Sequence, residues 1–191
     1  VVVANRNYGA DGKWDETSGI LFRNIVDVNG NLKIGKKYPY EISVKNSGKI
    51  DTYVRIILTK SMYNKDGEKT TNLSLDVLDL HLLNSDDWIV DETATTEYRT
   101  VMYYKKILLA GETTTSLTDY IRIDDSILWK AEEKNITEKN GCATIMMDYT
   151  YDGISFSIDI EADAVQTHNA EDAIRSAWGR DVTIDSNGNI E

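Results

Sequence analysis

Histidine, cysteine and proline are nearly absent from this sequence of 191 residues, which holds two histidines, one cysteine and one proline. A single cysteine cannot form a disulfide within the chain, so packing and hydrogen bonds must hold the fold. Two histidines that are far apart cannot supply the helical zinc-protease motif, which places two histidines one turn apart with a glutamate between them. These shortages exclude a disulfide scaffold and argue against a zinc protease of that kind.

Clusters of basic residues and long apolar runs are lacking as well. The chain has 32 acidic and 21 basic residues, which gives a formal net charge of -11. Binding to phosphates requires clustered lysine and arginine, so the charge argues against a nucleic-acid partner and against adhesion to anionic membranes. No stretch approaches the roughly 20 apolar residues of a membrane-spanning helix. We therefore expect neither a nucleic-acid partner nor a membrane span.

Residues that carry enzyme chemistry are few. No nucleophile elbow or phosphate-binding loop occurs. Cys142 lies in an apolar run and is interpreted as a small buried residue, with pairing to a histidine as the alternative. His81 lies in an alternating run and His168 at the entry to a helix, so both are interpreted as structural residues rather than metal ligands. We expect no enzymatic activity, no cofactor and no metal centre.

What the chain does contain is a long alternating run from 154 to 164, in which apolar and polar residues follow one another strictly. Because successive strand side chains face opposite sides of a sheet, this predicts a long strand with one face in a core. The inner face should include Phe156, Ile158 and Ile160. The outer face carries a row of carboxylates, hereafter the acid row: Asp159, Glu161 and Asp163. We interpret this row as solvated, with protection of a sheet edge or pairing with a basic neighbouring subunit as alternatives.

A helical spacing follows the alternating run. The apolar positions of this segment are Ala170, Ala173, Ile174, Ala177 and Trp178. Asn169 is predicted to cap the first turn, and Gly179 stands where helices commonly end. The pattern predicts a short C-terminal helix, with residues 179–191 as a tail.

The middle of the chain is rich in strand signals separated by turns. Alternating or β-prone runs cover 40–45, 53–59, 78–83, 98–108, 117–123 and 143–149, and Asp152-Gly153 is a hairpin signal before the last strand. No strand–helix–strand alternation, linker or repeat is present. The pattern predicts one all-β domain over residues 1–191, an antiparallel sandwich or barrel, with residues 1–35 as an atypical N-terminal segment.

Three turns rich in oxygen ligands are candidates for a hard cation. They are Asp11/Asp15/Glu16, Asn64/Asp66/Glu68 and Asp185/Asn187/Asn189/Glu191. Calcium takes six to eight oxygens, and each turn supplies only part of that set. We interpret them as solvated turns, with a weak calcium site as the alternative.

The order of several motifs resembles the TasA/camelysin family. The segments that carry the resemblance are 36–48 followed by 51–56, 78–82 followed by Trp88, 103–114, and 160–166 followed by Ala177-Trp178. Each motif alone is common among β proteins, and their order and spacing over roughly 36–178 carry the likeness. Residues 1–35 depart from the start that is usual in the family.

The resemblance implies an antiparallel jelly-roll β-sandwich that is exported by Gram-positive cells to the extracellular matrix or cell surface. Family members build biofilm fibres, whereas camelysin is described as a surface metalloprotease. The sequence has only two histidines, which favours the fibre-forming function over the metalloprotease function. We therefore expect a secreted matrix protein that assembles into fibres with copies of itself by β-strand addition, with other matrix proteins or polysaccharide as further partners.

The assembly strand is expected near the start of the sequence. Val1, Val2, Val3 and Ala4 are apolar and β-prone, and the following residues are rich in turn formers. An extended segment of this kind can complete the edge of a neighbour's sheet. The alternative is that these residues pair within their own sheet or are disordered.

A second function from a different class depends on the aromatic residues. Tyr103 and Tyr104 are adjacent in a predicted strand, so one should face inward and the other outward. An exposed tyrosine is a suitable anchor for a partner or a polysaccharide. The alternative function is therefore a cell-surface carbohydrate-binding or adhesion module, with these tyrosines and the acid row as its contact surface.

Overall fold

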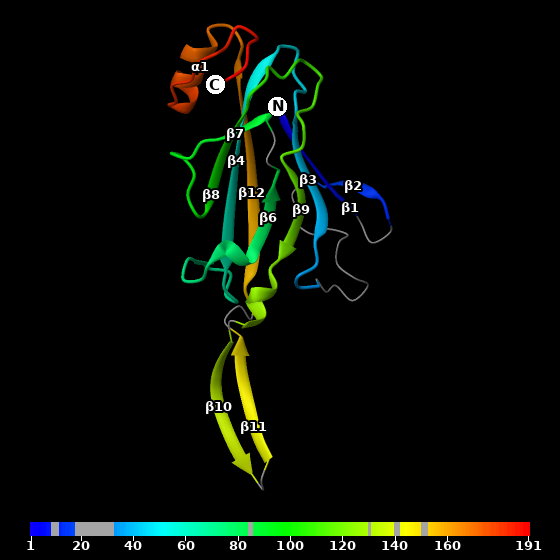
Figure 1. Ribbon diagram of the computed structural model, residues 1–191, viewed down its shortest axis with the longest axis vertical. Coiled ribbons are helices and arrows are strands. Elements are labelled where there is room, and N and C mark those ends of the chain that lie inside the picture. The colour runs from blue at the N-terminus through cyan, green and yellow to red at the C-terminus, as the bar shows by residue number, and fades with distance from the viewer. Residues whose placement is uncertain (9–11, 18–32, 84–85, 130, 140–141, 150–152) are drawn as a thin grey trace.

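The computed structural model describes residues 1–8, 12–17, 33–83, 86–129, 131–139, 142–149 and 153–191. Its strands form two antiparallel sheets that pack face to face, with one short helix near the C-terminal end of the chain (Figure 1). The predicted all-β sandwich with a short C-terminal helix is therefore confirmed.

Each sheet is assembled from strands that are distant in the sequence. The first sheet has the order β2 (Trp14–Thr17), β1 (Val2–Tyr8), β3 (Tyr38–Lys45), β9 (Thr118–Ile123) and β6 (Leu78–Leu82). The second sheet has the order β12 (Ser155–Gln166), β4 (Thr52–Tyr63), β8 (Arg99–Tyr104) and β7 (Trp88–Val90), and β5 (Lys69–Thr70) pairs with the end of β4.

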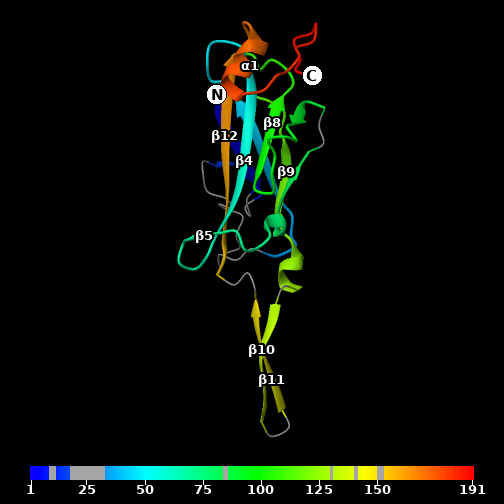
Figure 2. The same ribbon diagram turned by 90° about the vertical axis from the view of Figure 1, so that its left-hand side faces the viewer.

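The remaining elements lie at the two ends of the sandwich. Figure 2 shows the hairpin of β10 (Ala131–Lys139) and β11 (Cys142–Tyr149) leaving the sandwich at the end opposite to α1 (Ala170–Trp178). Two short 3₁₀ helices cover Leu75–Val77 and Asp125–Trp129. The predicted strand at 143–149 is confirmed, whereas the side chain of Cys142 and the predicted turn residue Asp152 lie outside the described residues.

The main core lies between the two sheets. Ile42 and Val44 of β3 face Val54 and Ile56 of β4, and all four are fully buried. Full burial of such a side chain contributes about 1.5–3 kcal/mol, so this alternation orients β3 and β4 toward each other. Lys60 of β4 also reaches across, because its Nζ donates to the carbonyl oxygen of Leu78 at 2.8 Å.

The long strand β12 has the predicted register. Phe156, Ile158 and Ile160 pack against the main core, and Asp159 and Glu161 are exposed. The three inner side chains are only partly buried, because β12 lies at the edge of its sheet and has a strand neighbour on one side.

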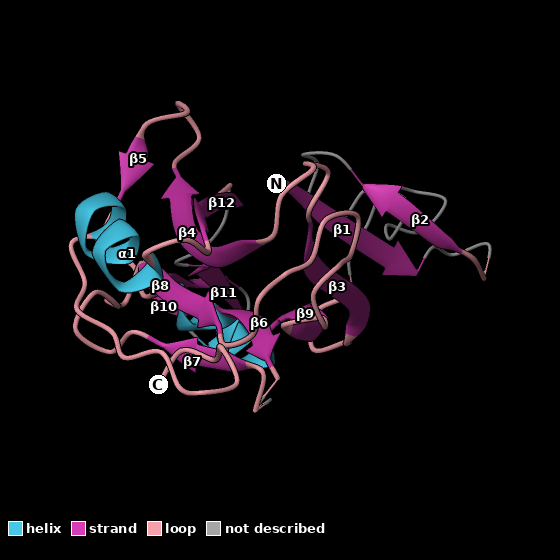
Figure 3. Cartoon of the chain, turned by 90° about the horizontal axis from the view of Figure 1, so that it is seen from above, coloured by secondary structure: helices cyan, strands magenta, loops and turns pink. Residues whose placement is uncertain are grey.

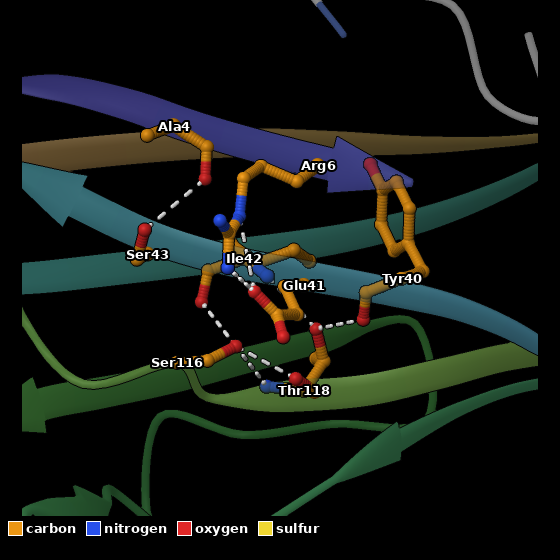
Figure 4. Close-up of polar contacts among 8 residues, drawn as sticks. All are labelled: Ala4, Arg6, Tyr40, Glu41, Ile42, Ser43, Ser116 and Thr118. Atoms are coloured by element: carbon orange, nitrogen blue, oxygen red, sulfur yellow. Dashed lines mark hydrogen bonds and ion pairs between the residues drawn. The ribbon is translucent and has the colours of Figure 1, made fainter. Parts of the chain in front are cut away.

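Hydroxyl groups replace part of the backbone ladder between β3 and β9, which pairs regularly over only the first two residues of β3. The hydroxyl of buried Thr118 accepts from the Ile42 N–H at 3.0 Å and donates to the Tyr40 carbonyl at 2.9 Å (Figure 4). Ser116 donates to the Ile42 carbonyl at 3.2 Å. These bonds satisfy buried backbone groups that would otherwise be costly.

A second, smaller core lies outside the sandwich. The helix α1 and residues 180–191 cover the outer face of β4 and β8 (Figure 3). Ile174 of α1 is fully buried in a cluster with Tyr53 and Ile57. The prediction that 179–191 is a tail is wrong. Ile190 is buried and donates its N–H to the Lys105 carbonyl at 2.8 Å, so the segment is packed on the sheet.

The ends of α1 agree with the sequence only in part. Gly179 ends the helix in a left-handed conformation with φ of 68°, as predicted. Asn169 does not cap the first turn with its side chain. It adopts a φ of 48°, and only its carbonyl takes part, as acceptor for the Ala173 N–H at 2.9 Å. Ala177, expected on the apolar stripe, is exposed.

Candidate interaction surfaces

The N-terminal residues lie in a strand of their own sheet. Val2 to Asn7 pair with β3, from Val2 opposite Lys45 to Asn7 opposite Tyr40. The Ser43 hydroxyl adds a bond to the Ala4 carbonyl at 3.3 Å (Figure 4). The prediction of residues 1–4 as a free assembly strand is therefore wrong for this structure, because the β-prone segment is satisfied by the edge of β3.

The edge of β12 is the longest open edge among the described strands. All twelve residues of β12 pair with β4, and no described strand pairs with its other side. Some Cα atoms of β1 lie within 8 Å of β12, but the two strands share no ladder. An open strand edge presents unpaired N–H and C=O groups to any incoming extended segment.

The acid row lies along this open strand. Asp159 and Glu161 point to solvent. Asp163 instead accepts from Arg55 of β4, with oxygen–nitrogen distances of 3.2 Å to Nε and 2.5 Å to the terminal nitrogen. The row is thus solvated at its first two members and tied into its own sheet at the third.

The two tyrosines predicted as a contact surface are both buried. Tyr104 faces the main core and packs against the ring of Trp88 at 5.1 Å. Tyr103 faces outward, but α1 covers it, and the Trp178 ring lies 5.4 Å away. With 4% and 7% exposure, Tyr103 and Tyr104 present no contact surface, and that prediction is wrong. Their opposite orientation was predicted correctly.

A buried carboxylate anchors the segment that covers Tyr103. Asp91 is 4% exposed and accepts hydrogen bonds from the Tyr103 hydroxyl at 3.0 Å and from the Thr93 hydroxyl at 2.7 Å. It also receives the N–H groups of Thr93 and Ala94 and lies 3.2 Å from Nε of Arg180. Arg180 comes directly after Gly179, at which α1 ends, so Asp91 ties the end of the helix to the sheet.

Electrostatics keep this carboxylate ionised. Burial raises the pKa of the Asp91 carboxyl, but the bonds from Thr93, Tyr103 and Ala94 and the charge of Arg180 lower it more, so the pKa lies below its ordinary value. Burial, followed by the bond to Asp91, raises the pKa of the Tyr103 hydroxyl. Because every partner of Asp91 is part of the fold, we interpret it as a structural anchor. Sequence reasoning missed it, since Asp91 and Arg180 are far apart in the chain.

The histidines lie in different settings. His81 is exposed on β6, with its Nδ1 2.6 Å from an Asp119 oxygen and its ring stacked on Tyr120 at 4.6 Å. His168 is exposed beside the entry to α1. Within the described residues, no group of three or more His, Cys, Asp or Glu side chains is arranged to hold a metal ion.

The candidate cation turns that the structure describes use their oxygens internally. Asn64 Oδ1 accepts the N–H groups of Asp66 and Glu68. Asp185 Oδ1 accepts the N–H groups of Asn187 and Asn189, and bonds from Asn189 are the main reason that the pKa of Asp185 is lowered. In the remaining candidate turn, near the start of the sequence, Asp11 and the side chains of Asp15 and Glu16 lie outside the described residues.

A hollow of about 730 Å³ opens beside the C-terminal segment. Its wall combines both charges, and Lys106 Nζ lies 2.6 Å from an Asp87 oxygen, which is the main reason that the pKa of Asp87 is lowered. The wall carries the four carboxylates of Asp86, Asp87, Asp185 and Glu191 and the two ammonium groups of Lys105 and Lys106, so its acidic charges exceed its basic ones and the hollow disfavours an anionic ligand.

No helix in the described part of the chain is long and apolar enough to cross a membrane. The sequence matches no protein-family model, and neither a curated protein nor a solved structure matches it. The resemblance to the TasA/camelysin family therefore stays a prediction.

Proposed function

We propose that this protein is a secreted structural subunit of an extracellular matrix, and that it assembles into fibres by β-strand addition at the open edge of β12. The observation that carries the proposal is the pairing of this strand: twelve residues are in register with β4 on one side, and no described strand occupies the other. The order of sequence motifs that resembles the TasA/camelysin family supports the extracellular location.

The backbone of β12 supplies the binding energy in this proposal. In an antiparallel ladder, alternate residues direct both N–H and C=O toward the same neighbour, so half of the residues in an edge strand direct theirs outward. Each bond to an incoming strand contributes about 0.5–1.5 kcal/mol net, and an edge of this length forms several. The inner side chains of β12, which are only partly buried, would gain cover from the added strand.

The acid row favours a fibre over a closed dimer. If β12 paired with β12 of a second copy about Ile160, Asp159 of one copy would lie opposite Glu161 of the other. Like charges directly opposite on paired strands are destabilising. Pairing with a different edge avoids this contact, and repeated pairing between unlike edges generates an open chain of subunits rather than a two-subunit complex.

Electron microscopy and hydrogen exchange test the proposal. Purified protein at high concentration should form filaments visible by negative stain. The peptide that covers 155–166 should exchange about half of its amides quickly in the monomer and few in the filament, because outward N–H groups become paired. Absence of filaments, or filaments in which this peptide gains no protection, would overturn the proposal.

Proline variants at two adjacent positions sharpen the test. Of Glu161 and Ala162, one directs its N–H to β4 and the other directs it outward. Proline at either position removes the N–H donor. In one of the two variants, Glu161→Pro or Ala162→Pro, the lost donor is the outward one, so the pairing with β4 survives and the monomer keeps the higher melting temperature. That variant should form no filaments, while Glu161→Ala and Ala162→Ser should form them. Filaments from the fold-preserving proline variant would exclude β12 as the acceptor.

A further inference from the structure

The outer face of the first sheet carries a row of ring side chains that crosses all five strands. Trp14 lies opposite Tyr8, and the β1–β3 register places Tyr8 opposite Pro39 at the next position. Pro39 lies opposite Tyr120, and Tyr120 lies opposite His81. Directly opposite residues in antiparallel strands share a face, so these five form one ring row, roughly 19 Å long for four strand spacings of about 4.8 Å.

From this ring row we infer that the protein binds a single, soluble chain of an uncharged polysaccharide across β2, β1, β3, β9 and β6. Tyr8 is 42% and Trp14 41% exposed, and the side chain of His81 is 45% exposed. Pro39 is exposed and Tyr120 is half-buried. Neighbours of the row along the strands, such as Tyr40, Leu80 and Ile121, point inward and are buried. The rings are thus set apart from the core and presented to solvent.

Contacts within the ring row hold its members in place before any ligand arrives. Tyr8 and Trp14 meet edge to face with 5.7 Å between ring centroids. His81 stacks on Tyr120 at 4.6 Å with only 5° between the ring planes. Side chains that are already ordered lose little entropy on binding, which favours the use of this row as a binding surface.

Polar groups flank the rings. Arg6 lies over the Trp14 ring at 5.1 Å, and Lys37 lies over the Tyr120 ring at 4.2 Å. A sugar ring has C–H groups on its faces and hydroxyls around its rim. Its C–H face packs on an aromatic ring, whose face carries partial negative charge. In the complex we expect the Lys37 ammonium to leave the face of the Tyr120 ring and to donate to sugar hydroxyls, and Asp119 to accept from those hydroxyls, while Arg6 keeps its pairing with Glu41.

The charge of this face selects an uncharged ligand. Arg6 pairs with Glu41 (Figure 4), and Arg122 pairs with Asp79 at 2.8 Å and with Asp124 at 3.1 Å. These cations are therefore engaged by carboxylates of the same face. A polyanion would also be repelled by the net charge of -11. A neutral chain meets neither obstacle.

The twist of the sheet selects a single chain over a crystalline surface. Adjacent strands in a sheet rotate by roughly 20–25°, so the rings of a row that crosses five strands do not share one plane. A flat crystal face contacts only part of such a row, whereas one flexible chain follows it from Trp14 to His81.

Affinity gel electrophoresis of the monomeric protein tests the inference. The gels contain hydroxyethylcellulose, galactomannan, xyloglucan or laminarin as uncharged chains, and alginate as an anionic chain. We expect retardation by at least one uncharged polysaccharide and none by alginate, and no depletion from solution by crystalline cellulose. Lack of retardation by all four uncharged chains, equal or stronger retardation by alginate, or strong binding to the crystal would each overturn the inference.

Ring substitutions locate the site. Trp14→Ala and Tyr120→Ala should each weaken binding about two- to tenfold, the value of one aromatic contact, whereas Trp14→Phe should keep most of it. Ile50→Ala is the matched control, because Ile50 is 63% exposed and lies outside the ring row. Unchanged binding by both alanine variants, with parental melting temperatures, would overturn the inference. The readout is independent of fibre formation, since the proline variant that blocks β12 should bind polysaccharide normally.

Discussion

The outer faces of the two sheets differ in what covers them. On the second sheet, α1 and residues 180–191 cover Tyr103, which is 4% exposed. On the first sheet, Tyr120 also points outward from a strand, but Figure 3 shows none of the described helices over β1 or β2. The same residue type thus anchors a second core in one case and belongs to an open surface in the other.

The outward residues of each sheet account for the difference. On β4 and β8 they include Tyr53, Ile57 and Val101, which are buried beneath the cover. On the first sheet they include Arg6 and Glu41, which form an ion pair and remain in contact with water. A sheet face with several large apolar residues requires a cover, whereas a face of paired charges and scattered rings does not.

Loss of the cover should have the largest effect on stability. Ile174→Ala should lower the free energy of unfolding by about 2–5 kcal/mol, because Ile174 is fully buried between α1 and the sheet. Denaturant unfolding measures the change. Ala177→Ser, on the exposed side of the same helix, is the control and should change stability by less than about 0.5 kcal/mol. Parental stability of Ile174→Ala would mean that α1 does not cover the face.

A somewhat smaller effect is expected from the anchor of the cover. Asp91→Asn should cost about 2 kcal/mol at neutral pH, since hydrogen bonds to an ionised group contribute about 1.5–3 kcal/mol. The pKa of Asp91 is lowered in the folded state. Its stabilisation is therefore fully present above the unfolded pKa of about 3.9 and is lost as pH falls through the folded pKa.

Melting temperatures at pH 7 and in steps below pH 4 test this sign. The gap between the parent and Asp91→Asn should be widest at neutral pH and should narrow in acid. A gap that stays constant, or widens, as pH falls would show that Asp91 is not the ionised anchor that the geometry indicates.

The sequence predicted the elements whose pattern is local. Strict alternation gave the register of β12, and Gly179 gave the end of α1. The local sequence of β4 also indicates that its outer face is partly apolar, because the outward positions include Tyr53 and Ile57. The burial of Tyr103 was missed, since it depends on a segment near the end of the chain in which Ile184 and Ile190 are separated by polar turn residues.

The candidate surfaces depend on register between distant strands, which no local pattern contains. The ring row needs Trp14, Tyr8, Pro39, Tyr120 and His81 to align through three ladders and one position beyond the end of the β1–β3 ladder. The anchor needs Asp91 to meet Arg180. Residues 2–7 pair with β3 of their own sheet. A β-prone segment fits the sheet edge of another subunit equally well, so the sequence alone does not decide between the two.

The smallest effect on stability is expected on the open face. Trp14→Ala removes a large side chain, yet it should lower the free energy of unfolding by no more than about 1 kcal/mol, because Trp14 is 41% exposed and its ring contacts are with Tyr8 and Arg6 at the surface. Trp178→Ala is the matched variant on the covered face, where the ring packs on Tyr103 and lies beside Arg55. It should cost about 3 kcal/mol, in the range for a truncated aromatic in a core.

Denaturant unfolding of the two variants measures the contrast directly. Equal losses would mean that the first sheet relies on its ring row for stability as the second sheet relies on its cover, and the row would then be a structural element rather than a binding surface. A small loss in Trp14→Ala together with weakened polysaccharide binding would separate the two roles, because exposed rings that add little to folding remain free to serve a ligand.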